Sequence, residues 1–235
     1  MLSGIPLIYG IDPHSSETTP SHQLGAIGMT SDGRKFRYAR AGAVALVAGN
    51  LIQSQAEATD SQDLALAAAA IGDTSITTTT TLTTTANEFA NGYMVVTVTP
   101  GLGQVLKIKS NPAVTTAAMT FTLKDPVVVA LTTSSRVDLV HNPYQAVVQW
   151  PATETGTAVG VAVTALAIDA YSWLATGGIA SVLQEGATAV GAQVHASTGT
   201  AGAVIDDPAI ALPAVGVAMT GIASGENGAI FLRLD

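Results

Sequence analysis

The stretch TSITTTTTLTTT, residues 74–85, contains nine threonines in twelve positions. Threonine is β-branched and stiff at χ1, which disfavours a helix and suits a pleated strand. Ile76 alternates with Thr78, and Thr80 with Leu82, which would give one partly apolar face and one wet face. A low-complexity linker is the alternative. A strand is favoured because the run leads through a turn-like ANEFANG into the β-rich MVVTVT.

Segments of the same kind continue along the rest of the chain. MVVTVT, VLKIKS, AAMTFTLKD and PVVVALTT are short and β-branched, and glycine, proline or asparagine separates them. The spacing resumes beyond residue 148 with segments such as GTAVGVAVTAL and closes with AIFLRLD. Short strands at such regular spacing predict an all-β protein made of antiparallel sheets, in a barrel or a sandwich.

A hairpin is predicted upstream, within residues 25–55. LGAIGMT is followed by the turn SDGR and then by KFRYARA. Asp32-Gly33 between two alternating runs is typical of a type I′ hairpin turn. In the second run, Phe36 and Tyr38 would point inward and the charged residues outward.

Residues 60–71, DSQDLALAAAAI, are ambiguous between helix and strand. Asp60 could cap an alanine-rich helix that Gly72 would end. Two strands about a Gly72-Asp73 turn fit as well, and the strand is slightly favoured because nothing around it is helical.

Prolines and turn signals divide the chain into an arm and two β-rich lobes. Residues 1–24 carry three prolines, which break any regular element and predict an extended N-terminal arm. A boundary is plausible near residues 137–148. We therefore expect one β domain over residues 25–143 and a second over residues 144–235.

Composition restricts the partners. Charged residues make up 11% of the 235-residue chain, against about 25% in an ordinary soluble domain, which suggests that a partner covers much of the exterior. The net charge of −8 argues against nucleic-acid binding. The absence of cysteine excludes disulfides and thiol chemistry. The N-terminus lacks the basic region of a signal peptide, and the longest apolar stretch is too short to span a bilayer, so we expect a soluble protein without a membrane partner.

No catalytic or metal-binding constellation can be nominated. His14 and His22 match no zinc motif, and the Asp206-Asp207 pair fits a solvated turn better than a calcium loop. We expect no enzyme, no cofactor and no metal. Tyr171 and Trp173 would lie on one face of a strand as core anchors, with a sugar-binding platform as the competing interpretation.

Two segments are candidates for binding a partner protein. The basic cluster DGRKFRYAR would contact an acidic protein surface rather than DNA, through Arg34, Lys35 and Arg37. The arm is too apolar for a solvated tail and would dock on a neighbouring subunit or another surface, through Ile5, Leu7, Ile8, Tyr9 and Ile11. The alternative is that the arm folds back over its own lobe and covers a sheet edge.

Taken together, several segments resemble the head decoration, or capsid cement, proteins of tailed bacteriophages. They are DGRKFRYARAGAVALVAGNL, NGYMVV, KIKSNP, DLVHNPY, AYSWLATGGIASVL and AIFLRLD, and the resemblance spreads over residues 24–235. Each is a turn or strand pattern without catalytic content, so their order along the chain is the more specific signal.

The resemblance implies a β-rich homotrimer on the outer surface of the virion. Such a protein binds the major capsid protein, clamps neighbouring subunits and stabilises the head. A tail or baseplate β-module that binds host glycan is the rival expectation.

Overall fold

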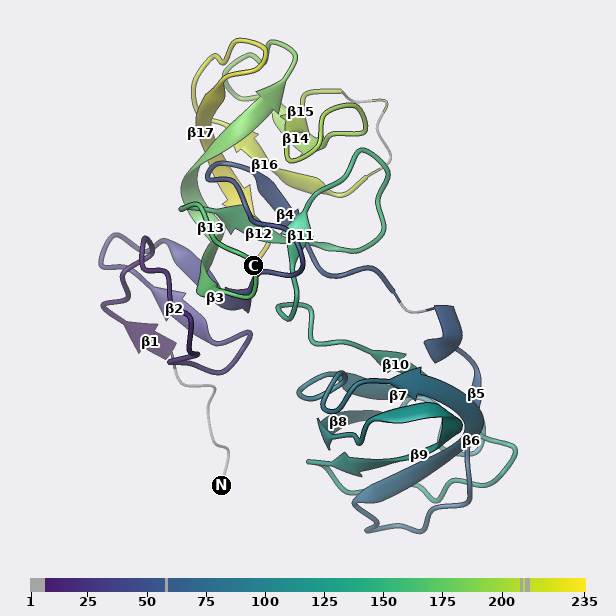
Figure 1. Cartoon of the computed structure of the whole chain (residues 1–235). Helices are drawn as coiled ribbons and strands as arrows, with labels where there is room; N and C mark the ends of the chain where they lie inside the picture. The colour runs from purple at the N-terminus through teal and green to yellow at the C-terminus, as the bar shows by residue number, and fades with distance from the viewer. Residues whose placement is uncertain (1–6, 58, 208, 210–211) are drawn as a thin grey trace. The chain divides into compact units, whose positions relative to one another are not determined.

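The computed structural model describes residues 7–57, 59–207, 209 and 212–235, and the chain forms two compact units (Figure 1). Unit 1 combines the residues up to 56 with those from 143 onward, and unit 2 comprises residues 57–142. The prediction of an all-β protein with two β-rich lobes is confirmed, since 46% of the chain is strand. The described residues contain no α-helix. They accordingly include no helix long and apolar enough to cross a membrane.

Unit 1 is built on one eleven-stranded sheet in which the long strand β13 pairs with β3, β12, β15 and β17. The first part of β13 runs antiparallel to β3, and the second part runs antiparallel to β17. The strands are β1 Leu7–Tyr9, β2 Ile27–Met29, β3 Lys35–Arg40, β4 Leu51–Gln53, β11 Val148–Gln149, β12 Ala158–Ala162, β13 Tyr171–Glu185, β14 Gln193–Ala196, β15 Val204–Ile205, β16 Ala214–Ala218 and β17 Asn227–Arg233.

Unit 2 contains a six-stranded sheet in the order β5-β10-β7-β8-β9-β6. An isolated bridge between Leu66 and Thr78 and a hydrogen bond from the Ala65 amide to the Thr80 hydroxyl link the segment of β5 to β6, at the other end of this order. The sheet therefore closes on itself like a barrel. The strands are β5 Leu64–Ala65, β6 Ser75–Thr84, β7 Tyr93–Val98, β8 Val105–Ser110, β9 Val114–Leu123 and β10 Arg136–Val140.

The threonine-rich run forms β6, as predicted, and pairs antiparallel with β9. Ile76 and Thr78 are buried, as are Leu82 and Thr84 further along. Between these pairs the register shifts, so the three residues between Thr78 and Leu82 are exposed. The expected pairing of Thr80 with Leu82 on one face is therefore wrong. The irregularity lets the Thr80 hydroxyl accept the hydrogen bond that links β6 to Ala65.

The division into units differs from the expected domains over residues 25–143 and 144–235. One junction, between Asn142 and Pro143, lies where the sequence suggested it. The other follows Ala56, because β3 pairs with β13 and β4 pairs with β11 and β12. Long-range antiparallel pairing of this kind leaves no local signal, since a strand's alternation shows its buried face but not its partner.

Residues 60–71 follow the strand alternative. A 3-10 helix, η1 (Thr59–Ser61), precedes β5, and Ala69 forms a bridge with Leu131. Gly72 adopts a positive φ of 94° at the predicted turn, a conformation that glycine reaches without steric cost.

The N-terminal arm follows the alternative in which it folds back over its own lobe. Its first six residues, and with them the candidate Ile5, lie outside the described residues. From Leu7 on, the chain forms β1, which runs parallel to β2, and Glu17 bridges to Tyr171. Residues 7–24 are therefore part of unit 1, although β1 is their only strand.

Candidate interaction surfaces

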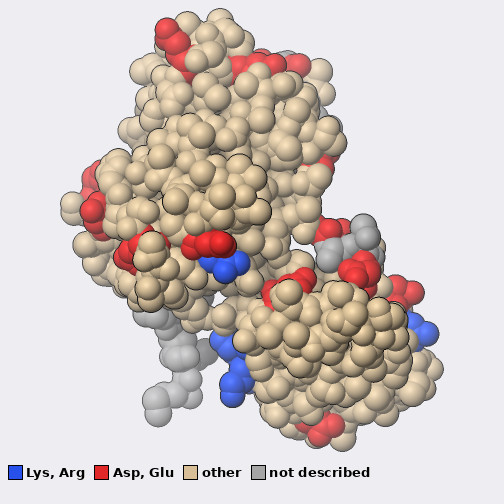
Figure 2. Space-filling view, viewed as in Figure 1, with Lys and Arg blue, Asp and Glu red and all other residues tan. Residues whose placement is uncertain are grey.

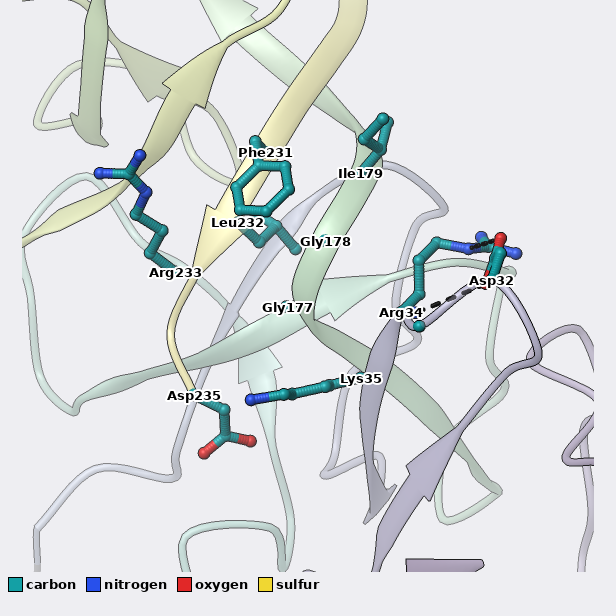
Figure 3. A pocket seen from close by; sticks show the side chains of 11 residues that line it. Asp32, Arg34, Lys35, Gly177, Gly178, Ile179, Phe231, Leu232, Arg233 and Asp235 are labelled. Carbon is teal, nitrogen blue, oxygen red and sulfur yellow. Dashed lines mark hydrogen bonds and ion pairs between the residues drawn. The ribbon is translucent and has the colours of Figure 1, made fainter. Parts of the chain in front are cut away.

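A groove of about 560 Å³ opens on unit 1 where the start of β3, the middle of β13 and the end of β17 meet (Figure 3). We call it the basic groove, and it includes two of the predicted partner-binding residues, Arg34 and Lys35. Its lining consists of Asp32, Gly33, Arg34, Lys35, Gly177, Gly178, Ile179, Phe231, Leu232, Arg233 and Asp235.

The predicted hairpin positions Arg34 and Lys35. β2 and β3 pair antiparallel, and Gly33 takes a positive φ of 84° in the turn between them. Asp32 stabilises the turn because it accepts a hydrogen bond from the Thr30 hydroxyl and forms an ion pair with Arg34 at 2.8 Å. The hairpin therefore carries a paired arginine followed by an exposed lysine.

Two glycines form the floor of the basic groove and leave room for the basic side chains. A Cβ added to Gly177 would lie 3.3 Å from Cδ of Lys35, and one added to Gly178 would lie 3.0 Å from Cγ of Arg34. Gly178 also has a φ of 87°, which side chains other than glycine rarely adopt. The stems of Arg34 and Lys35 therefore lie directly against the backbone of β13.

Arg37 holds Asp235 next to the basic groove. Its guanidinium binds both carboxylate oxygens of Asp235, at 2.7 and 2.9 Å, and donates to the Gly25 carbonyl at 3.1 Å. Burial acts to raise the pKa of the Asp235 carboxyl, but the hydrogen bonds and charge of Arg37 outweigh it and lower the pKa. Arg37 is thus a positioning residue within unit 1.

A row of apolar side chains forms the other wall of the basic groove. Ile179 of β13 pairs with Phe231 of β17, which pairs with Val217 of β16. Ile179 is 50% exposed and Phe231 40% exposed. The groove therefore combines an exposed aromatic ring with flanking basic residues.

A second surface of unit 1 is formed by two segments that contain only apolar residues. Residues 43–48 read AVALVA and residues 165–168 read ALAI. Reciprocal backbone hydrogen bonds between Leu46 and Leu166 hold the two segments side by side. Both leucines point into the core, whereas Val44, Val47 and Ile168 are 54–60% exposed. We call these exposed residues the unit-1 patch.

Unit 2 has an apolar surface of its own, made by loops that Gln104 ties together. The Gln104 amide donates to the Val129 carbonyl at 2.9 Å and accepts hydrogen bonds from the Val128 and Val129 amides. The Gly72 amide donates to the Val127 carbonyl, which draws the adjacent turn to the same place. The resulting unit-2 patch is 50–68% exposed and consists of Ile71, Leu102, Val128 and Val129.

Both patches consist of uncharged residues only. Charged residues are sparse over the molecule as a whole. Figure 2 shows that large areas of the face in view carry neither Lys and Arg nor Asp and Glu. Groups of exposed apolar side chains such as these two mark interaction sites in soluble proteins.

The arm residues proposed to bind a partner are mostly occupied within unit 1. Ile8 and Ile11 pack against the core cluster that contains Phe36 and Trp173. Leu7 is half-buried in β1, whereas Tyr9 is 71% exposed. Of the described arm candidates, Tyr9 is therefore the one most open to a partner.

The arm also covers the rings that were considered as a sugar platform. Trp173 is 2% exposed, and the rings of His22 and Tyr38 lie 5.2 Å from it. The Tyr38 hydroxyl donates to Glu17 at 2.6 Å, which lowers the pKa of the Glu17 carboxyl. Trp173 is thus a core anchor and cannot stack on a ligand.

The sequence predicted the hairpin side of the basic groove, but it did not predict that Ile179, Phe231 and Arg233 line the groove. The alternation in AIFLRLD places Phe231 and Arg233 on one face of a strand, and this was the available signal. It could not show that this face lies beside the hairpin, almost 200 residues away in the chain.

Comparison with known proteins gives no further identification. No protein-family model matches the chain, and neither the curated proteins nor the solved structures include a match. Over the described ranges, no three histidine, aspartate or glutamate side chains are grouped closely enough to hold a metal ion.

Proposed function

We propose that this protein is a virion structural protein, a decoration protein that binds the outer surface of a bacteriophage capsid and stabilises the head. The observation that carries the proposal is the pair of uncharged apolar patches, one on each unit. Large apolar side chains such as Val44 and Val128 are exposed there on a chain with few charged residues. The order of segments that resembles capsid cement proteins supports the same function.

Two patches on two units suit a protein that joins neighbouring subunits of a shell. Each patch would bind one surface of the major capsid protein, and the chain that connects the units would link the two contacts. Linking makes the second contact intramolecular, which raises the overall affinity without stronger individual contacts. Specific interfaces of this sort bury on the order of 1,200–2,000 Å².

Stabilisation of the head follows from mass action. A protein that binds the assembled shell and not the free subunits stabilises the shell by about 2.7 kcal/mol per site when its free concentration is about 100 times Kd. Repetition over a symmetric lattice multiplies this contribution. We also propose a homotrimer as the bound form, which sedimentation velocity would detect.

Electron cryo-microscopy of intact particles of the phage that carries the gene is the direct test. Density for two β-rich units on the outside of the capsid is the expected result. A paired experiment adds the purified protein to shells that lack it and measures the temperature at which the shells break. Density confined to the tail, or shells that bind none of the protein, would overturn the proposal.

Substitution of the patches tests the observation on which the proposal rests. Val44→Asp with Val47→Asp places two charges on the unit-1 patch, and Val128→Asp with Val129→Asp does the same on the unit-2 patch. Each pair should abolish shell binding while the melting temperature stays close to that of the unaltered protein, since the residues are exposed. Thr79→Asp with Thr81→Asp, on the exposed part of β6, is the matched control.

A further inference from the structure

The positive charge of unit 1 is concentrated at one place. Its five basic residues are on β3, on the turn before it, or on β17: Arg34, Lys35, Arg37, Arg40 and Arg233. Its ten acidic residues are distributed along the whole unit: Asp12, Glu17, Asp32, Glu154, Asp169, Glu185, Asp206, Asp207, Glu226 and Asp235. Three of the five cations of this negatively charged unit, Arg34, Lys35 and Arg233, thus line the basic groove.

Two of these cations are available to a ligand. Arg34 is paired with Asp32, and Arg37 with Asp235. Lys35 and Arg233 are both exposed, and among the described residues neither side chain makes a hydrogen bond or a close ion pair, although the charge of Lys35 contributes to the lowered pKa of Asp235. In the view of Figure 3, Phe231 lies between the Arg233 side chain and Ile179, and Lys35 extends across the groove below them.

We propose that the basic groove binds an acidic segment of a partner protein. Carboxylates of the segment pair with Lys35 and Arg233, and an apolar side chain of the same segment lies on Phe231 and Ile179. Gly177 lets the stem of Lys35 lie against the backbone of β13, so this exposed side chain crosses the groove (Figure 3). This inference rests on the proposed function and deepens it, because it names a contact and the chemistry of the surface that the capsid would present.

The chemistry of the groove favours a protein segment over a nucleic acid. A phosphate backbone carries a charge at every nucleotide and would bring several of them against the lining carboxylates of Asp32 and Asp235, whereas a protein segment can place its carboxylates only opposite Lys35 and Arg233. Tight binding to nucleic acid requires several phosphate contacts, and the net charge of −8 opposes it over long range. An acidic segment with an apolar residue complements both the two exposed cations, Lys35 and Arg233, and the exposed ring of Phe231.

The test uses a fluorescein-labelled peptide in which glutamate alternates with leucine, measured by fluorescence anisotropy with the full chain. We expect binding that weakens with added salt. Lys35→Gln with Arg233→Gln should weaken it about fivefold, as expected for two exposed ion pairs. Lys109→Gln with Lys124→Gln makes the same charge change at exposed positions of unit 2 and should leave binding unchanged.

Two further measurements test the apolar contact and the peptide charge separately. Phe231→Ala should weaken peptide binding without changing its salt dependence, and a peptide with glutamine in place of glutamate should bind at least about fivefold more weakly and with little salt dependence. Equal loss in the unit 2 control, or no binding of the glutamate peptide to the unaltered protein, would overturn the proposal. Preferential binding of a single-stranded oligonucleotide that depends on Lys35 and Arg233 would overturn it in favour of nucleic acid.

Shell binding by the same variants separates this inference from the proposed function. If the groove variant loses the peptide but binds shells as well as the unaltered protein, the groove is not the capsid contact and decoration still stands. If the unaltered protein binds the peptide through the groove but binds no shell, decoration is overturned and the groove remains a binding site.

Discussion

The two units reach similar β architectures by different routes along the chain. In unit 2, β7, β8 and β9 are successive strands that pair with their neighbours in sequence. In unit 1, the central pairings join β3 to β13 and β13 to β17, across more than a hundred residues in the first case. Two of the five pairings in the unit 2 order join successive strands, and all five lie within one continuous segment, whereas unit 1 depends on contacts between two separate parts of the chain.

Their cores differ in the same sense. Unit 1 gathers its largest rings from the two separate parts of the chain, with Phe36 and Tyr38 from one and Trp150 and Trp173 from the other. Unit 2 has Phe89 and Phe121, 6.1 Å apart, among aliphatic and methionine side chains from one continuous segment. Removal of part of the chain should consequently affect the two units very differently.

The largest expected effect comes from dividing the chain. Residues 57–142 expressed alone should fold with a single cooperative transition, because their core and sheet lie within that segment. Residues 143–235 expressed alone should remain unfolded, since β13 would lose β3 and the rings that cover Trp173. Circular dichroism during heating measures both. A cooperative transition in the second fragment would show that unit 1 does not need its N-terminal strands.

Matched core substitutions should give the next largest effect. Trp173→Ala in unit 1 and Phe121→Ala in unit 2 each remove a fully buried ring and should cost about 3–5 kcal/mol. Calorimetry of the full chain should show each substitution lowering only one of two transitions. A single transition that both substitutions shift equally would mean that the units unfold together.

The buried side chain of Asn111 joins three backbone groups of unit 2. Asn111 accepts from the Phe89 amide and donates to the carbonyls of Thr85 and Pro112, all at 2.9 Å. Asn111→Ala leaves the buried Phe89 amide without its partner and removes the hydrogen bonds to the two partly buried carbonyls, so it should destabilise unit 2 by about 1–3 kcal/mol in urea unfolding. The exposed Gln62→Ala should stay within about 0.5 kcal/mol. A result for Asn111→Ala as small as that of the control would contradict the structural role.

The smallest expected effect is a pH dependence confined to unit 2. Burial lowers the pKa of His141, and Glu88 opposes this shift only in part. Below the ordinary value of 6.5 the unfolded state binds a proton that the folded state does not, so the free energy of unfolding of unit 2 should fall as the pH decreases. His141→Phe, which keeps the stacking on Phe89, should remove this slope between about pH 6.5 and 5. An unchanged slope would assign the titration to other groups.

The same contrast explains how much the sequence could predict. The threonine strand, the hairpin at Asp32-Gly33 and the inward Phe36 and Tyr38 are local patterns, and all three are found in the structure. The alternation of a strand does not name its partner, so the discontinuous unit 1 and the docking of residues 7–24 could not be derived. For the candidate sites, the basic side of the groove was predictable from its own strand. Phe231 and Arg233 were not, because β17 reaches β13 only through the fold.

The order of the strands has a consequence for synthesis on the ribosome. Residues 7–56 emerge first, but the strand that pairs with β3 begins at Tyr171, after all of unit 2 has been translated. At typical elongation rates this interval lasts on the order of 10 s. Phe36 and Tyr38 must wait unburied while the later segment folds first. In nascent chains stalled near residue 185, unit 2 has left the ribosomal exit tunnel while β13 is still inside it, so a protease should cut within residues 7–56 and spare residues 57–142.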